Sequence, residues 1–134
     1  MVENIGSEDN TEINITYETI FGLLRREKNR DELQKLNDTF YADIKSYLEE
    51  KNKVFLPQAK DMFSESEREK TLKQITNTKR MITELFERRE KKVIILALNK
   101  VRTLSSITDL STMLNDEKEC FYKMTGLCSG YMDF

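Results

Sequence analysis

The sequence predicts an all-α protein, a helical bundle built around one long central helix. The composition favours helices, because 34% of the residues are charged and the chain has one Pro, four Gly and no Trp. In addition, no Gly or Pro interrupts residues 64–103, where apolar residues recur with a helical period. A chain of 134 residues is the size of one ordinary domain and is large enough to bury a core.

The first fifteen residues are polar and acidic without hydrophobic periodicity, so residues 1–15 are predicted to form a flexible leader and residues 16–134 the helical domain. Thr16 occupies an N-cap position. Apolar residues follow it at helical spacing and predict the first helix: Tyr17, Ile20, Phe21 and Leu24. A charged run, Arg25 to Arg30, ends this helix.

The second helix is expected to begin at a cap formed by Asn37 or Asp38. Its predicted apolar face consists of Phe40, Tyr41, Ile44, Tyr47 and Leu48. Pro57 lies among isolated hydrophobic residues without a sustained period, which predicts a loop over residues 52–63 with room for one short helical piece.

The central helix is expected to start at one of two overlapping capping boxes, Ser64 with Glu67 or Ser66 with Glu69, and to reach Thr103. Such a helix would hold about 38 residues and span nearly 60 Å. Its first part has an inward stripe of apolar residues: Leu72, Ile75, Ile82, Leu85 and Phe86. Charged residues between them are placed to pair along the helix, Glu84 with Arg88 and Glu87 with Lys91.

The second part of this helix, Val93 to Leu98 (VIILAL), is apolar around its full circumference. One layer of neighbours cannot cover all these side chains, and each one left in water would forgo roughly 1.5–3 kcal/mol. We therefore expect most of them to face the core and a minority to face another subunit, although the chain's own last helices are an alternative cover. The candidate core and interface residues are Tyr17, Phe21, Ile82, Leu85, Phe86, Ile94, Ile95 and Leu98.

The C-terminal part is predicted to hold two more helices after Ser105 and Ser106 end the central one. The first would contain Ile107, Leu110, Met113 and Leu114, and the last would be capped by Asn115 and place Cys120, Met124, Leu127 and Tyr131 on one face, flanked by Phe121 and Cys128. The two cysteines lie about 12 Å apart along such a helix, too far for a disulfide with each other. Buried, reduced thiols of a cytoplasmic protein are expected.

Several function classes find little support. The chain has no His, which removes the usual nucleophile pairs and most zinc and di-iron sites, so neither a catalytic residue, a metal nor a cofactor is predicted. Acidic pairs such as Glu65 with Glu69 or Asp116 with Glu119 lack basic neighbours or a phosphate loop. No signal sequence is evident, and the longest apolar run is too short to span a membrane.

Three blocks of sequence, in this order, carry a resemblance to a known family: TYETIFGLLRREKNRDELQKLNDTFYADIKSYLEE, NTKRMITELFERREKKVIILALNKVRT and LNDEKECFYKM. Together they resemble the archaeal GINS subunits of the class in which the helical domain comes first, over roughly residues 16–130. The matching positions are Phe40 and Tyr41 at the start of the second helix, and Asn77, Arg80, Arg88, Arg89, Lys91, Lys92, Ile94, Ala97 and Leu98 in the central helix.

The resemblance implies a non-enzymatic scaffold subunit of a tetramer in DNA replication, located at the replisome. Its partners would be copies of itself or paralogous GINS subunits, the MCM replicative helicase and a RecJ-like factor. Members of this class continue into a small C-terminal β domain, which this sequence is expected to lack after Phe134. The family makes its contact with the RecJ-like factor through the β domain, so this contact is the least supported of the implied interactions.

Two alternatives remain open. A nucleic-acid-binding helical module would use the cluster Lys79, Arg80, Arg88, Arg89, Lys91 and Lys92. Glu84, Glu87 and Glu90 are interleaved with these cations, and the chain has a net charge of -2, so direct DNA contact is expected to be weak. The other alternative is a homo-oligomeric helical adaptor of another pathway.

Overall fold

The computed structural model describes residues 15–103 and 109–132, and these residues are all-helical with one long central helix, as predicted. No strand occurs among them. The elements, in chain order, are α2 (Tyr17–Asn29), α3 (Phe40–Asn52), the short 3-10 helices η1 (Lys53–Phe55) and η2 (Pro57–Ala59), α4 (Glu65–Thr103) and α5 (Asn115–Met132). Most of the predicted leader, residues 1–14, lies outside the described part, and Ile15 packs against the core.

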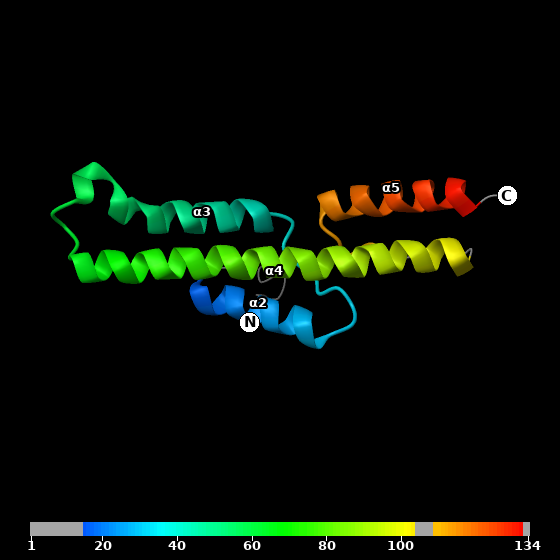
Figure 1. The fold of residues 1–134 in the computed structure, drawn as a ribbon, viewed down its shortest axis with the longest axis horizontal. Coiled ribbons are helices and arrows are strands. Elements are labelled where there is room, and N and C mark those ends of the chain that lie inside the picture. Colours follow the sequence, from blue (N-terminus) through cyan, green and yellow to red (C-terminus); the bar gives the residue numbers. More distant parts are fainter. Residues whose placement is uncertain (1–14, 104–108, 133–134) are drawn as a thin grey trace, which may run out of the picture.

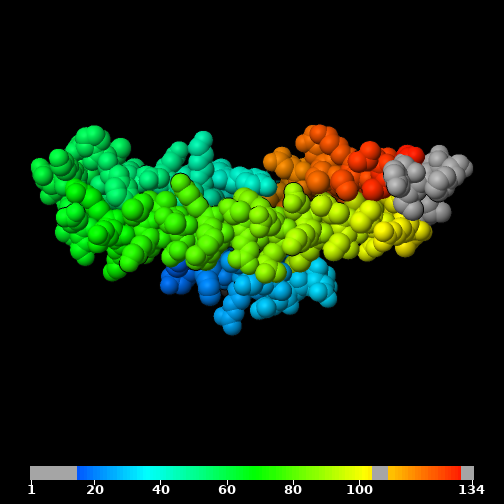
Figure 2. Space-filling view, in the orientation of Figure 1, coloured from blue at the N-terminus to red at the C-terminus, as the bar shows by residue number. Residues whose placement is uncertain are grey.

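The helices α2, α3 and α5 pack against α4, which runs the length of the molecule (Figure 1). With 39 residues, α4 is about 58 Å long at 1.5 Å per residue. Figure 1 shows α3 along its first half and α5 along its second half on one side, and α2 on the opposite side near the middle. The space-filling view in Figure 2 shows the resulting elongated shape. Within the described residues, a single layer of helices therefore packs on two sides of α4.

Two of the predicted helix starts form as expected. The Thr19 N–H donates to Thr16 Oγ1 at 3.1 Å, which caps α2. At the start of α4 the capping box is reciprocal, because the Ser64 N–H donates to Glu67 Oε1 at 2.8 Å and the Glu67 N–H donates to Ser64 Oγ at 3.1 Å. These contacts satisfy backbone donors that have no partner within the helix.

The other predicted caps are displaced by one or two residues. Thr39 precedes α3, and Asn37 accepts a hydrogen bond from the Thr39 N–H at 3.1 Å without capping the helix itself. At α5 the Leu114 N–H donates to Glu117 Oε1 at 2.8 Å, so the helix begins at Asn115 instead of being capped by it. Glu117 is the residue that supplies this cap.

The short helix predicted around Leu110 and Met113 is wrong for the residues that the structure describes. Residues 109–114 form a turn in which the Ser111 N–H donates to Asp109 Oδ1 at 2.9 Å. An Asp side chain that accepts from the backbone two residues later favours a turn over a helix. Ser105, Ser106 and Ile107 lie outside the described residues. The predicted loop, residues 52–63, contains η1 and η2, and α3 reaches Asn52.

The core consists of two clusters on either side of the middle of α4. The first cluster joins α2, α3 and the first half of α4 and contains Ile20, Leu24, Leu36, Phe40, Ile44, Met81, Ile82, Leu85 and Leu114. The second joins the second half of α4 to α5 and contains Leu33, Val93, Ala97, Met113 and Phe121. Leu72 was predicted to face inward but is 54% exposed. Cys120 and Cys128 are free thiols, and both are partly exposed instead of buried.

Candidate interaction surfaces and a buried ion-pair network

The predicted interface residues divide into interior and surface positions. Ile82 and Leu85 are buried in the first core cluster, and Tyr17 and Phe86 pack against the same cluster. The Phe86 ring lies 6.2 Å from the Phe40 ring in an edge-to-face arrangement. These four positions hold α2 and α3 on α4. Phe21, in contrast, is half exposed on α2.

The apolar segment Val93 to Leu98 is covered on one side only. Val93 and Ala97 are buried in the second core cluster, and Leu96 packs against that cluster. Ile94 and Leu98 are partly exposed, and Ile95 is 55% exposed. The chain's own last helix therefore covers part of the circumference, and a second part remains in contact with solvent.

Ile94, Ile95 and Leu98 share one side of α4, because each residue advances by about 100° around the helix. We call these three residues the outer apolar patch. Earlier positions on the same side are charged and include Arg80, Glu84, Glu87 and Lys91. This side of α4 thus changes from charged to apolar directly after Lys91. Lys28 of α2 reaches the charged part through its pair with Glu84, whereas Ile95 in the apolar part is 55% exposed.

The side of α5 that faces away from α4 is also open. Tyr122 is 60% and Leu127 is 70% exposed. A Cβ added at Gly126 or Gly130 would meet no atom within 4 Å, so the helix backbone is accessible there. These positions form a second uncovered helix face.

Of the six cations proposed as nucleic-acid contacts, all except Arg89 line one groove beside α2. Lys79, Arg80 and Lys91 are exposed on α4. Arg88 pairs with Glu84 at 3.0 Å, as the one-turn spacing predicted, whereas no ion pair joins Glu87 to Lys91 among the described residues. Lys92 and Arg89 point toward the interior, and Arg89 cannot contribute to a nucleic-acid surface because it is fully buried.

Arg89 lies at the centre of a buried network that joins four segments. Its Nε and Nη2 donate to the carboxylate of Glu117 on α5 at 2.7 and 2.8 Å. Its Nη1 donates to Glu27 Oε1 on α2 at 2.9 Å and to the Gln34 carbonyl at 2.7 Å, and its Nη2 donates to the Thr112 carbonyl at 2.9 Å. The guanidinium therefore has five acceptors at full burial.

Glu27 has a second cation, since Lys92 Nζ donates to its Oε2 at 2.7 Å and to its backbone carbonyl at 2.8 Å. The side-chain amide of Gln34 donates to Glu27 Oε1 at 2.9 Å and to the Leu23 carbonyl at 2.6 Å. Burial by itself would raise the pKa of Glu27, but hydrogen bonds from Lys92 and Gln34 and the charge of Arg89 outweigh it and lower the pKa. Burial by itself would lower the pKa of Arg89, but the pairing with Glu117 and Glu27 outweighs burial and raises the pKa. Glu27 and Arg89 are thus both held in their charged forms.

The sequence carried a signal for this network that composition and charge counts do not reveal. Glu27 follows Ile20 and Leu24 at i+7 and i+3, which places it on the buried stripe of α2. Arg89 is in phase with Ile82, Leu85 and Val93 on α4 in the same way. A charged residue in phase with an apolar stripe requires a buried partner of opposite charge.

Comparison with known protein families, curated proteins and solved structures finds no match for this chain. The described residues hold no group of three or more His, Cys, Asp or Glu side chains able to bind a metal ion. Within the same residues, no helix combines the length and apolar character needed to cross a membrane.

Proposed function

We propose that this protein is a non-enzymatic scaffold subunit that assembles with further helical subunits through the outer apolar patch of α4. The observation that carries the proposal is Ile95, which is 55% exposed between the partly exposed Ile94 and Leu98 on the uncovered side of a 39-residue helix. Contiguous apolar side chains bordered by charged ones are typical of protein–protein contact sites.

The long, thin shape supports the same role. A helix about 58 Å long that one layer of neighbours covers presents surfaces far apart from one another, which is what a protein joining several partners requires. A further helix packed on Ile94, Ile95 and Leu98 would remove three large aliphatic side chains from water. At roughly 1.5–3 kcal/mol for each fully buried side chain, that gain is sufficient to hold subunits together.

The finer proposal follows the resemblance to archaeal GINS subunits. On that basis the assembly is a tetramer of one or two kinds of subunit, located in the cytoplasm at the nucleoid. It links the MCM replicative helicase to a RecJ-like factor in DNA replication. Residues of the central block that carries the resemblance include Ile94 and Leu98 of the outer apolar patch, so the resemblance and the exposed surface concern the same part of α4.

The test compares Ile95→Asp with Leu72→Asp, because the two side chains lie on the same helix and are 55% and 54% exposed. An unpaired carboxylate is costly when a contact between subunits removes it from water, and it costs little where it stays in solvent. We therefore expect light scattering to give a lower molar mass for Ile95→Asp than for the wild type, and an unchanged mass for Leu72→Asp. Equal masses for the two variants, or a monomeric wild type at high concentration, would refute assembly through this patch.

A second measurement separates a replication scaffold from a homo-oligomeric adaptor of another pathway. The wild-type assembly is mixed with an archaeal MCM helicase, and both co-purification and the ATPase rate of the helicase are measured. Co-purification that depends on the assembled form supports the replication role. Assembly without any interaction with the helicase would leave the scaffold and remove the GINS-like role.

A further inference from the structure

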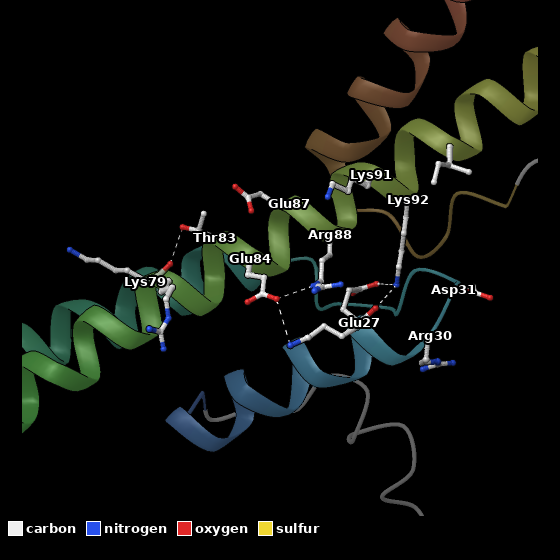
Figure 3. Close-up of a pocket in the computed structure, with 13 residues that line it drawn as sticks. Glu27, Arg30, Asp31, Lys79, Thr83, Glu84, Glu87, Arg88, Lys91 and Lys92 are labelled. Atoms are coloured by element: carbon white, nitrogen blue, oxygen red, sulfur yellow. Dashed lines mark hydrogen bonds and ion pairs between the residues drawn. The ribbon is translucent and has the colours of Figure 1, made fainter.

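A broad groove runs between the C-terminal part of α2 and the side of α4. It has a volume of about 1120 Å³ and extends on α4 from Lys79 to Ile95, which is about 24 Å at 1.5 Å per residue. Figure 3 shows Arg88 and Lys92 reaching from α4 toward the end of α2, with Lys79 and Lys91 farther out on α4. Glu27 is buried beneath Lys92 and forms part of the wall of the groove.

The groove is positively charged although the whole chain has a net charge of -2. Seven cationic and four acidic side chains line it. Lys92 is paired with Glu27, and Lys28 and Arg88 share Glu84. Among the described residues, no acidic side chain pairs with the remaining four cations: Arg30, Lys79, Arg80 and Lys91. The unpaired cations therefore outnumber the unpaired acids of the groove, Asp31 and Glu87.

The lining favours a polypeptide over a nucleic acid. None of the described residues that line the groove is aromatic, so they offer no ring on which a base could stack. Asp31 and Glu87 interrupt the positive surface, so a peptide whose carboxylates are separated by neutral residues fits it better than a continuous chain of phosphates. One large aliphatic side chain, Ile95, lies at the end of the groove and offers an apolar contact that a phosphate backbone cannot use.

We propose that this groove binds an acidic polypeptide segment of a partner protein, with its carboxylates on Arg30, Lys79, Arg80 and Lys91 and an aliphatic side chain against Ile95. The groove is continuous with the outer apolar patch through Ile95, so a partner seated on that patch brings such a segment into reach. Its length along α4 matches about seven residues of extended chain. Binding here does not depend on the identity of the assembly as a GINS-like tetramer.

The experiment uses the full chain and a fluorescein-labelled peptide in which glutamates flank one central leucine. Fluorescence anisotropy is measured for the wild type and for the double variant Arg80→Glu with Lys91→Glu. The matched control is Lys45→Glu with Lys60→Glu, which makes the same change in net charge at exposed lysines outside the groove. We expect the groove variant to bind about tenfold more weakly than the wild type and the control to bind within about twofold, because close charges dominate.

Three outcomes overturn the proposal. Equal losses in the groove variant and the control would show that binding follows only the net charge. Equally tight binding of a peptide with glutamines in place of glutamates would exclude a role for the carboxylates. Tighter binding of a single-stranded oligonucleotide of the same length, lost in the groove variant, would assign the groove to nucleic acid instead. Light scattering of the groove variant should give the wild-type mass, which separates this test from that of assembly.

Discussion

Arg89→Met tests whether the buried network holds the helices together. Methionine fills most of the volume of the arginine side chain and removes the guanidinium with its five hydrogen bonds. The Gln34 and Thr112 carbonyls then lose a buried donor, and Glu117 loses both of its bonds to Arg89. Removing one partner from a buried ion pair typically destabilises a protein by about 3–5 kcal/mol.

The expected loss lies at the lower end of that range, at about 3 kcal/mol, for a reason visible in the structure. Glu27 keeps Lys92 and the Gln34 amide after the substitution, and Glu117 keeps the Leu114 N–H. Such a loss is still a large part of the 5–15 kcal/mol by which domains of this size are stable. Chemical denaturation followed by circular dichroism, at one fixed protein concentration, measures it, since assembly itself is linked to stability.

Arg88→Met is the matched control on the neighbouring position. Arg88 pairs with Glu84 at the surface, where both side chains are more than one third exposed, and such pairs contribute at most about 1 kcal/mol. The reasoning is refuted if the two variants unfold at the same denaturant concentration. A double-mutant cycle with Glu27→Gln then isolates the coupling between Glu27 and Arg89 from other effects of the substitutions.

Three further predictions concern single positions. The folded-state pKa of Glu27 is lowered from its ordinary 4.5. The ionised carboxylate therefore stabilises the folded state fully above pH 4.5, and this stabilisation is lost as the pH falls through the folded-state pKa. The free energy of unfolding between pH 7 and 3 should therefore fall less in Glu27→Gln than in the wild type; parallel curves would contradict this. Ser64→Ala removes the cap that accepts from the Glu67 N–H and should lower the unfolding free energy by about 1 kcal/mol, whereas the exposed Ser66→Ala should change it little. Gly126→Ala should raise it by about 0.5–1 kcal/mol, because the added Cβ meets open space on α5, and a loss of stability would show that something covers this face.

The sequence predicted the long central helix because its signals are local. The capping box of Ser64 and Glu67, the absence of Gly and Pro, and the period of the apolar residues all lie within α4 or directly before it. For the apolar segment Val93 to Leu98, the sequence predicted only that some side chains are buried and others are exposed. The positions of α2 and α5 on α4 decide which side chains are buried, and these positions depend on the tertiary structure. The exposure of Leu72 could not be predicted from the sequence for the same reason. Its place in an apolar stripe does not show whether another helix reaches it.

The basic cluster of α4 was the hardest part to interpret from sequence. Arg88 and Arg89 are adjacent and chemically identical, yet one lies at the surface and the other is fully buried. Their difference depends on helical phase, because Arg89 lies in the same stripe as Leu85 and Val93. Its partners Glu27 and Glu117 lie 62 and 28 residues away in the chain, and only the tertiary structure brings them together.

The network also explains how the segment between α2 and α3 and the turn before α5 can pack closely against α4. Backbone carbonyls in such segments need donors once they are removed from water. Two side chains of α4 supply them, because Arg89 donates to the Gln34 and Thr112 carbonyls and Lys92 donates to the Glu27 and Glu32 carbonyls. Lys92 also places a positive charge at the C-terminal end of α2, where the helix dipole favours it.

We infer that this arrangement fixes the positions of α2 and α5 along α4. Sliding either helix by one turn would separate Glu27 or Glu117 from Arg89 and leave a buried charge without its partner, which is far more costly than the loss of an apolar contact. The groove and the outer apolar patch then keep a fixed geometry relative to each other. In Arg89→Lys a single ammonium cannot serve the five acceptors of the guanidinium. Amides of α5 should therefore exchange with solvent faster than in the wild type, and unchanged hydrogen-exchange protection of α5 in this variant would contradict the inference.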